Sequence, residues 1–108
     1  MRQRKERSLA DHIINREITG HKGRYVIRAA KELGGEEAEL TWSVTSPELV
    51  IADHTFVPDS FRGTGAGLAL VTRLVADARA EGFKIMPLCP FVNAQRLRHP
   101  EWADVFSV

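Results

Sequence analysis

The sequence predicts an α+β fold with one mixed β-sheet, in which an antiparallel meander is followed by a β-α-β unit and a C-terminal helix. Two observations predict it. Three strand-like segments between residues 24 and 57 are separated only by short turn signals, and a long helical pattern with another short apolar segment follows. Strands joined by short turns pair antiparallel, whereas a strand that follows a crossover helix pairs parallel.

The first two strands are predicted at residues 24–30 and 37–44. Residues 24–30 are short, apolar and partly β-branched, and residues 37–44 alternate, with Ala38, Leu40, Trp42 and Val44 on one face. Such alternation is typical of a half-buried strand. Between them, Gly34-Gly35 fits the positive-φ positions of a tight hairpin.

The central strand is predicted at residues 49–57, after a turn at Ser46-Pro47. This segment is apolar on both faces except at Asp53, His54 and Thr55, which is typical of a strand inside a sheet. A weaker strand is predicted at residues 12–18.

The β-α-β unit continues with a helix over residues 66–81. Its apolar residues recur at helical spacing, and Gly82 stands where helices often end in the left-handed conformation. The predicted apolar stripe is Leu68, Val71, Leu74, Val75 and Ala78. A strand is predicted at residues 83–88, then a last helix from about residue 91 to 98, ended by Pro100.

The composition excludes several classes of protein. The chain has 108 residues, 44% of them apolar, with a net charge of +1, so disorder is not expected. Cys89 is the one cysteine, no apolar run is long enough for a membrane span, and no secretory signal is recognised, so we expect a cytoplasmic protein. Residues 1–7 hold four basic residues and one acidic residue, and the rest holds 11 basic and 13 acidic ones. We therefore expect a flexible basic tail at residues 1–8, a single domain at residues 9–108, and no nucleic-acid partner.

The glycine-rich segment at residues 62–67 is the strongest chemical signal. It reads Arg-Gly-Thr-Gly-Ala-Gly and lies between the central strand and the long helix. Backbone N–H groups in such a loop, followed by a helix N-terminus, favour a phosphate or pyrophosphate; a plain tight turn is the alternative. The segment lacks the Lys-Ser/Thr pair of a P-loop and the third glycine of a dinucleotide fingerprint.

The spacing Arg-x-x-Gly-x-Gly at Arg62, Gly65 and Gly67 resembles the acyl-CoA pyrophosphate loop of the GNAT superfamily of N-acetyltransferases. The resemblance extends to the small single-domain branch of that superfamily, from about residue 13 to the C-terminus. The matching blocks are residues 53–58 (DHTFVP), 61–67 (FRGTGAG), 89–92 (CPFV) and 99–102 (HPEW).

The resemblance implies a GNAT-like fold and transfer of an acetyl group from acetyl-CoA to an amine acceptor of unknown identity. The pantetheine arm of the cofactor is then expected to pair with the end of the central strand, where the parallel neighbour splays away. The implied cofactor-binding residues are Phe56, Val57, Arg62, Gly63, Thr64, Gly65, Ala66 and Gly67. The expected partners are therefore acyl-CoA and the amine, and the chain is expected to act as a monomer or a homodimer.

The acceptor amine must lose a proton before it reacts, and His54 is the candidate base by residue type and position. Strand alternation predicts that Asp53 points to the opposite face. The alternative for His54 is a buried histidine bonded between sheet and helix. Cys89, at the end of the last strand, is the second candidate catalytic residue, as a proton donor to the leaving thiolate or an acyl carrier. Its alternative is a small buried thiol.

A tyrosine on the last helix, which many GNAT members use to protonate the thiolate, has no counterpart here, since Tyr25 is the one tyrosine. His99-Pro100 is interpreted as a helix stop that docks Trp102 on the core. No metal site is predicted from His54, Cys89 and His99, because no pair has a recognised ligand spacing. The alternative function is a non-catalytic module or sensor that binds acyl-CoA or CoA.

Overall fold

The computed structural model describes residues 12–29 and 34–108. The predicted tail at residues 1–8 lies outside these ranges. In chain order the elements are β1 (Asn15–Thr19), β2 (Lys22–Arg28), β3 (Glu37–Ser46), β4 (Leu49–Phe56), the 3-10 turn η2 (Asp59–Phe61), α2 (Ala66–Glu81), β5 (Lys84–Pro87), α3 (Pro90–Arg98) and the 3-10 segment η3 (Pro100–Val105).

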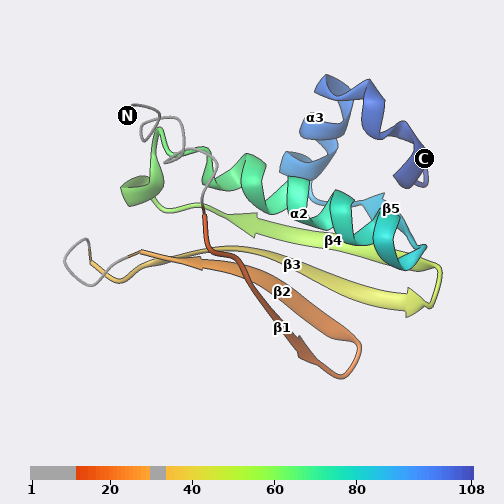
Figure 1. Cartoon of the computed structure of the whole chain (residues 1–108), viewed down its shortest axis with the longest axis horizontal. Coiled ribbons are helices and arrows are strands. Elements are labelled where there is room, and N and C mark those ends of the chain that lie inside the picture. The colour runs from red at the N-terminus through yellow and green to blue at the C-terminus, as the bar shows by residue number, and fades with distance from the viewer. Residues whose placement is uncertain (1–11, 30–33) are drawn as a thin grey trace.

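The five strands form one sheet in the order β1-β2-β3-β4-β5 (Figure 1). The pairs β1–β2, β2–β3 and β3–β4 are antiparallel, and β4–β5 is parallel, because α2 carries the chain back between them. This arrangement confirms the predicted α+β fold with a meander followed by a β-α-β unit.

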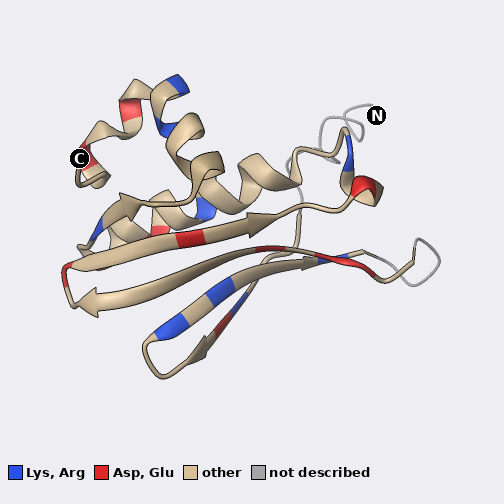
Figure 2. Ribbon diagram, turned by 180° about the vertical axis from the view of Figure 1, so that it is seen from behind, with Lys and Arg blue, Asp and Glu red and all other residues tan. Residues whose placement is uncertain are grey.

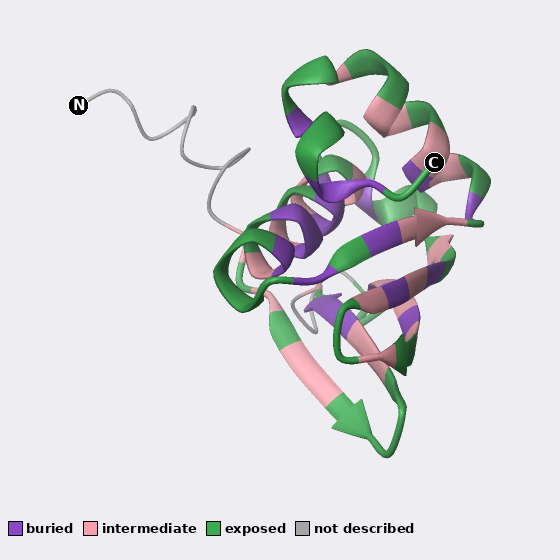
Figure 3. Ribbon diagram, turned by 90° about the vertical axis from the view of Figure 1, so that its right-hand side faces the viewer, coloured by how far each residue is buried: buried purple, intermediate pink, exposed green. Residues whose placement is uncertain are grey.

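The two faces of the sheet differ, and we name them by what covers them. The inner face packs against α2 and, near β4 and β5, against α3; the outer face carries no helix in the described part of the chain (Figures 1 and 3). The inner side chains of β3 are Ala38, Leu40 and Trp42, each at most 4% exposed. Trp102 of η3 is also buried in this core, as predicted.

Helix α2 has the predicted bounds and ends at Gly82, whose φ is +82°. Its buried face includes Ala66 and Leu70, which the predicted stripe lacks, and leaves out Leu68. Leu70 is fully buried, whereas Leu68 is 41% exposed. The sequence offers leucines at both positions, so spacing alone did not decide which of them faces the sheet.

The turns of the meander also correct the prediction. Gly34 and Gly35 both have positive φ, yet β2 ends at Arg28 and β3 begins at Glu37, so the connection is longer than a two-residue turn. The weak first strand is β1, displaced toward the C-terminus from the predicted residues 12–18, and it turns into β2 at Gly20-His21. Within the described ranges, no helix is long and apolar enough to cross a membrane.

Candidate functional site

The parallel pair β4–β5 separates partway along its length. The two strands are in register from Leu49↔Lys84 to Ala52↔Pro87, and the Cys89 amide then donates to the Ala52 carbonyl at 2.9 Å. Helix α3 begins at the next residue, Pro90, and takes the chain off the sheet. Residues 53–56 of β4 therefore have no neighbouring strand on this side, and we call them the open edge. This is the predicted splay.

A β-bulge marks the start of the open edge. Trp42 of β3 is opposite Ala52 and Thr41 is opposite His54, so Asp53 is an extra residue in β4. Ser43 Oγ, on the outer face, donates to Asp53 Oδ2 at 2.6 Å. Because a bulge adds one residue, Asp53 and His54 both lie on the outer face. The prediction that they point to opposite faces is wrong.

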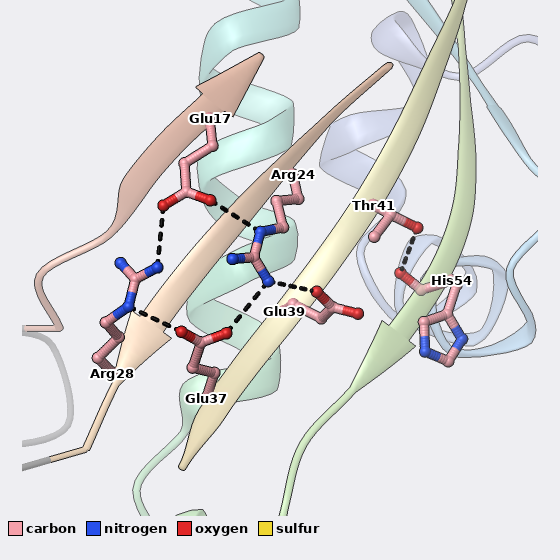
Figure 4. A network of polar contacts seen from close by, with 7 residues as sticks. All are labelled: Glu17, Arg24, Arg28, Glu37, Glu39, Thr41 and His54. Carbon is pink, nitrogen blue, oxygen red and sulfur yellow. Dashed lines mark hydrogen bonds and ion pairs between the residues drawn. The ribbon is translucent and has the colours of Figure 1, made fainter. Parts of the chain in front are cut away.

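His54 is exposed on this outer face (Figure 4). Its cross-strand neighbour is Thr41, whose Oγ1 lies 3.4 Å from the His54 carbonyl oxygen. The alternative of a buried histidine between sheet and helix is therefore wrong. An exposed imidazole beside the open edge can reach a ligand and exchange protons with solvent.

Cys89 lies on the other side of the sheet. It is 3% exposed, belongs to the inner core, and its Sγ is 3.2 Å from Thr55 Oγ1. Thr55 is opposite the inner-face residue Leu40, which puts its hydroxyl on the inner face as well. The structure thus separates the two candidate catalytic residues: His54 is outside the sheet, and Cys89 is beneath the open edge.

The glycine-rich segment at residues 62–67, which we call the glycine loop, connects η2 to α2. Gly63 and Gly65 both have φ of +78°, a conformation that L side chains rarely adopt, and a Cβ on Gly63 would meet nothing within 4 Å. Thr64 Oγ1 caps the loop by accepting from the Ala66 amide at 3.2 Å. Among the described residues, the amides of Gly63, Gly65, Gly67 and Leu68 find no hydrogen-bond partner. These amides are available to an anion.

Gly67 has a packing role that sequence reasoning did not identify. A Cβ at this position would lie 2.8 Å from Phe91 Cζ and 3.5 Å from Val57 Cγ2. The lack of a side chain therefore lets the first turn of α2 approach both α3 and the segment after β4. This approach brings the glycine loop next to the open edge.

Arg62 and Phe56 are exposed at the entrance to this region. The Arg62 side chain is 79% exposed, and its guanidinium is 3.1 Å from the exposed carboxylate of Asp59. Phe56, the last residue of β4, is 54% exposed, whereas Val57 packs partly against the core. An exposed pair of this kind contributes little stability, so Arg62 can turn toward an anion at low cost.

Two residues that the sequence analysis considered for a chemical role, Tyr25 and His99, have hydrogen-bond partners elsewhere in the structure. The Tyr25 hydroxyl donates to Asp77 Oδ2 at 2.6 Å, and burial, the largest cause, raises the pKa of Tyr25. His99 Nδ1 is 2.9 Å from Glu101 Oε2, and its ring stacks on Trp102. None of these groups reaches Cys89 or His54 by a hydrogen bond. Within the described ranges, no three His, Cys, Asp or Glu side chains are grouped to hold a metal ion.

Ion pairs join β1, β2 and β3 on their outer face (Figure 4). Figure 2 shows charged residues of both signs along these strands. Arg24 bonds to Glu17, Glu37 and Glu39, and Arg28 bonds to Glu17 and Glu37. The hydrogen bonds from Arg28 and then Arg24 lower the pKa of Glu17 below its ordinary value. The outer face is hollowed at one side of this network, with a volume of about 430 Å³. Glu17 and Arg24 of the network are part of the lining, together with Asp53.

The bulge and the hollow are the features that sequence reasoning missed. The one available signal was the run Asp53-His54-Thr55, three successive polar residues in an apolar strand, where alternation would give no two in succession. The partner of Asp53, Ser43, gave no signal, because its position relative to Asp53 depends on the register of β3 and β4.

The class of protein follows from a comparison with a family model. Residues 24–105 match the model of the GCN5-related N-acetyltransferases. The chain belongs to this family, which confirms the predicted enzyme class, an N-acetyltransferase.

A solved structure supports the same class. The solution structure of a GCN5-like protein of Staphylococcus aureus, itself assigned as an N-acetyltransferase, is similar with a TM-score of 0.65. It is 25% identical, and the match covers 86% of this chain and 87% of that chain. No curated protein sequence matches. The α+β fold of this chain is therefore one that it shares with a GCN5-like protein.

Proposed function

We propose that the chain transfers an acetyl group from acetyl-CoA to the nitrogen of an amine. One observation carries the proposal: the glycine loop, with unpaired amides, lies beside the open edge of β4, with Gly67 packed against Val57 and Phe91. A ligand with a diphosphate at one end and an amide-containing arm at the other matches both features. The resemblance of the glycine loop to the acyl-CoA loop of the small single-domain branch supports the same assignment.

The residues of the glycine loop fit the diphosphate. Gly63 and Gly65 hold the backbone in a left-handed conformation, and no side chain fills the space beside Gly63. The loop amides and the α2 N-terminus then present N–H groups and a partial positive charge to the phosphate oxygens. Arg62 adds a mobile guanidinium that can bind them bidentately.

The open edge fits the pantetheine arm. The backbone of the open edge, beyond the residues of β4 that pair with β5, can hydrogen-bond to the amides of the arm, in the way an extended peptide adds to a sheet edge. Phe56 and Val57 border this edge, and their apolar surface suits the aliphatic parts of the arm. When bound, acetyl-CoA supplies an acetyl thioester, whose carbonyl carbon bonds to the amine nitrogen as its bond to sulfur breaks.

His54 is the residue that we assign as base. Its exposed imidazole is beside the open edge, and it takes one proton from the acceptor ammonium at a ring nitrogen. The nitrogen loses a second proton as the amide forms, and this proton replaces the one that the Cys89 thiol gives to the departing sulfur. Because the Cys89 thiol is buried beside Thr55, we assign it to this inner side, as the group that hands a proton to sulfur.

The test is acetyl transfer to a broad panel of amines and peptides, with acetyl-CoA binding measured by calorimetry on the same samples. We expect wild type to bind acetyl-CoA and to acetylate at least one amine. His54→Gln should bind acetyl-CoA like wild type and lose roughly 100-fold in kcat, as expected for the loss of a general base. Cys89→Ser should show a smaller loss in kcat than His54→Gln, because serine keeps a hydroxyl proton.

Two outcomes would contradict the proposal. Binding of acetyl-CoA without turnover on any amine would favour the alternative, a non-catalytic acyl-CoA module. Absence of any binding would remove both functions.

A further inference from the structure

The hollow in the outer face is directly beside the candidate catalytic position. Its volume is about 430 Å³, and its lining includes Lys22, Thr41 and Asp53 from three different strands. Asp53 is the first residue of β4 beyond the pairing with β5, and His54 follows it. An acceptor in this hollow would therefore have one end at the open edge. The volume suits a small molecule better than a protein surface.

The charges of the outer face divide into two groups. The three glutamates of the network pair with the two arginines through contacts of 2.8 to 3.2 Å, and one negative charge is left over in the network. Lys22 and Asp53 differ from them: within the part of the chain that the structure describes, neither has an oppositely charged group within 4.0 Å. The hollow thus presents one unpaired cation and one unpaired carboxylate to a ligand.

Ser43 fixes the arrangement of these two charges. Its hydroxyl donates to Asp53 Oδ2 at 2.6 Å and accepts from Lys22 Nζ at 3.3 Å. Lys22 is opposite Ser43 in the register of β2 and β3, so both charged groups are on the same face. One serine therefore holds two opposite charges a short distance apart, at one side of the hollow.

The order of the two charges gives the ligand a direction. Asp53 belongs to β4, next to the open edge, whereas Lys22 belongs to β2, two strands away in the sheet. A carboxylate binds an ammonium group and a lysine binds a carboxylate. A ligand with both groups would thus place its ammonium nearer the open edge and His54, and its carboxylate farther away.

We propose that the acceptor is a small zwitterionic amine, such as a free amino acid, bound with its ammonium on Asp53 and its carboxylate on Lys22. The proposal rests on the acetyl-transfer function given above. Asp53 is then a specificity residue that holds the acceptor nitrogen near the open edge. His54, exposed on the same face, takes the proton, since Asp53 already accepts a hydrogen bond from Ser43.

The experiment compares free amino acids with their primary amides, which keep the ammonium and lose the carboxylate. Initial rates of acetylation are measured for both members of each pair with wild type, Lys22→Gln and Asp53→Asn. Glu48→Gln is the matched control, because Glu48 is exposed in the β3–β4 turn and outside the hollow. Calorimetry with acetyl-CoA and thermal unfolding are recorded for every variant.

We expect Lys22→Gln to raise KM about tenfold for the amino acid and to leave KM for the amide unchanged, since one charge-assisted hydrogen bond is lost. Asp53→Asn should raise KM for both, again about tenfold. Ser43→Ala should raise KM for the amino acid and for the amide less than Asp53→Asn does, because this variant keeps both charges and loses only the hydroxyl that orients them. A general loss of folding would not produce this difference between acid and amide.

Three results would overturn the inference. The first is that Lys22→Gln changes KM for the amino acid and KM for its primary amide by the same factor. The second is KM values that Asp53→Asn leaves unchanged. The third is a chain that binds acetyl-CoA and acetylates no zwitterionic amine. Each of these results would contradict the zwitterionic acceptor and would still allow acetyl transfer to another amine. A failure to bind acetyl-CoA would contradict the proposed function itself.

Discussion

The two faces of the sheet carry side chains of different kinds, although both are formed by the same strands. On the inner face, Tyr25, Leu40 and Trp42 are at most 4% exposed and pack under α2. On the outer face, the alternate residues of the same strands are Arg24, Glu39 and Thr41, which contact one another or solvent (Figure 4). The inner face resembles the core of any α+β domain, whereas the outer face has polar groups and a hollow.

This difference between the two faces indicates that residues of the outer face can be used for ligand binding without destabilising the fold. The inner face is closely packed, so a change in side-chain volume there must alter stability. The outer face holds its groups by ion pairs between exposed or half-buried side chains, without the close packing of the inner face. Changes there should alter ligand binding and leave folding nearly intact. Each prediction below tests one side of this division.

The largest expected effect is loss of stability when an inner-face contact of α2 is removed. Leu70→Ala should lower the free energy of unfolding by about 2–5 kcal/mol, because Leu70 is fully buried and a cavity would remain. Leu68→Ala, in the same helix with 41% exposure, is the control and should cost about 1 kcal/mol or less. Urea denaturation measures both. Equal losses would mean that the described orientation of α2 is wrong.

The second effect is crowding of the inner face by one methyl group. A Cβ on Gly23 would clash with the indole ring of Trp42 at Cζ2, so Gly23→Ala must displace the indole. We expect a loss of about 1–3 kcal/mol in the free energy of unfolding, as for an overpacked core. Near-ultraviolet circular dichroism should show the change in the tryptophan environment. An unchanged spectrum and midpoint would contradict the packing of Trp42 over β2.

The third effect is confined to the glycine loop. Gly63→Ala forces a side chain into a φ of +78°, where an L residue is disfavoured by about 1–2 kcal/mol. The variant should bind acetyl-CoA more weakly, because relief of this strain moves the amides that face the diphosphate. Gly20→Ala, with a φ of +62° in the β1–β2 turn, is the control for strain alone. If both variants kept wild-type affinity, the glycine loop would not be the diphosphate site.

The smallest effect is the pH dependence of the outer-face network. The pKa of Glu17 is lowered from 4.5 by Arg28 and Arg24, so its contribution to stability is fully present above about pH 4.5 and is lost as the pH falls through the lowered value. Arg28→Gln should reduce this acid sensitivity, and high salt should do the same in wild type. Melting temperatures recorded between pH 6 and pH 3 measure this loss of stability. A stability that rose on acidification would contradict these ion pairs.

The sequence predicts the elements that depend on local pattern. The bounds of α2 follow from the helical spacing of apolar residues and from Gly82, and β3 follows from its alternation. The mixed sheet follows from connection lengths, since turns give antiparallel pairs and α2 gives a parallel one. The glycine loop can be predicted from the sequence because its three closely spaced glycines are visible there directly.

The remaining features depend on register between distant residues. The bulge at Asp53 arises only when Thr41 and Trp42 are set opposite His54 and Ala52, which no local pattern specifies. A one-residue change in count moves a side chain to the other face of a strand. For this reason the predicted face of Asp53 was wrong, and the hollow beside it could not be predicted.

The central claim is that acetyl-CoA binds along the open edge and the glycine loop. The direct measurement is a titration of ¹⁵N-labelled protein with acetyl-CoA, followed by amide chemical shifts. The largest changes should fall on the open edge (residues 53–56), the glycine loop (residues 62–67) and the first turn of α2. Amides of β1 and of the β1–β2 turn should not move. Changes centred on β1 and β2, with the glycine loop unaffected, would contradict the account.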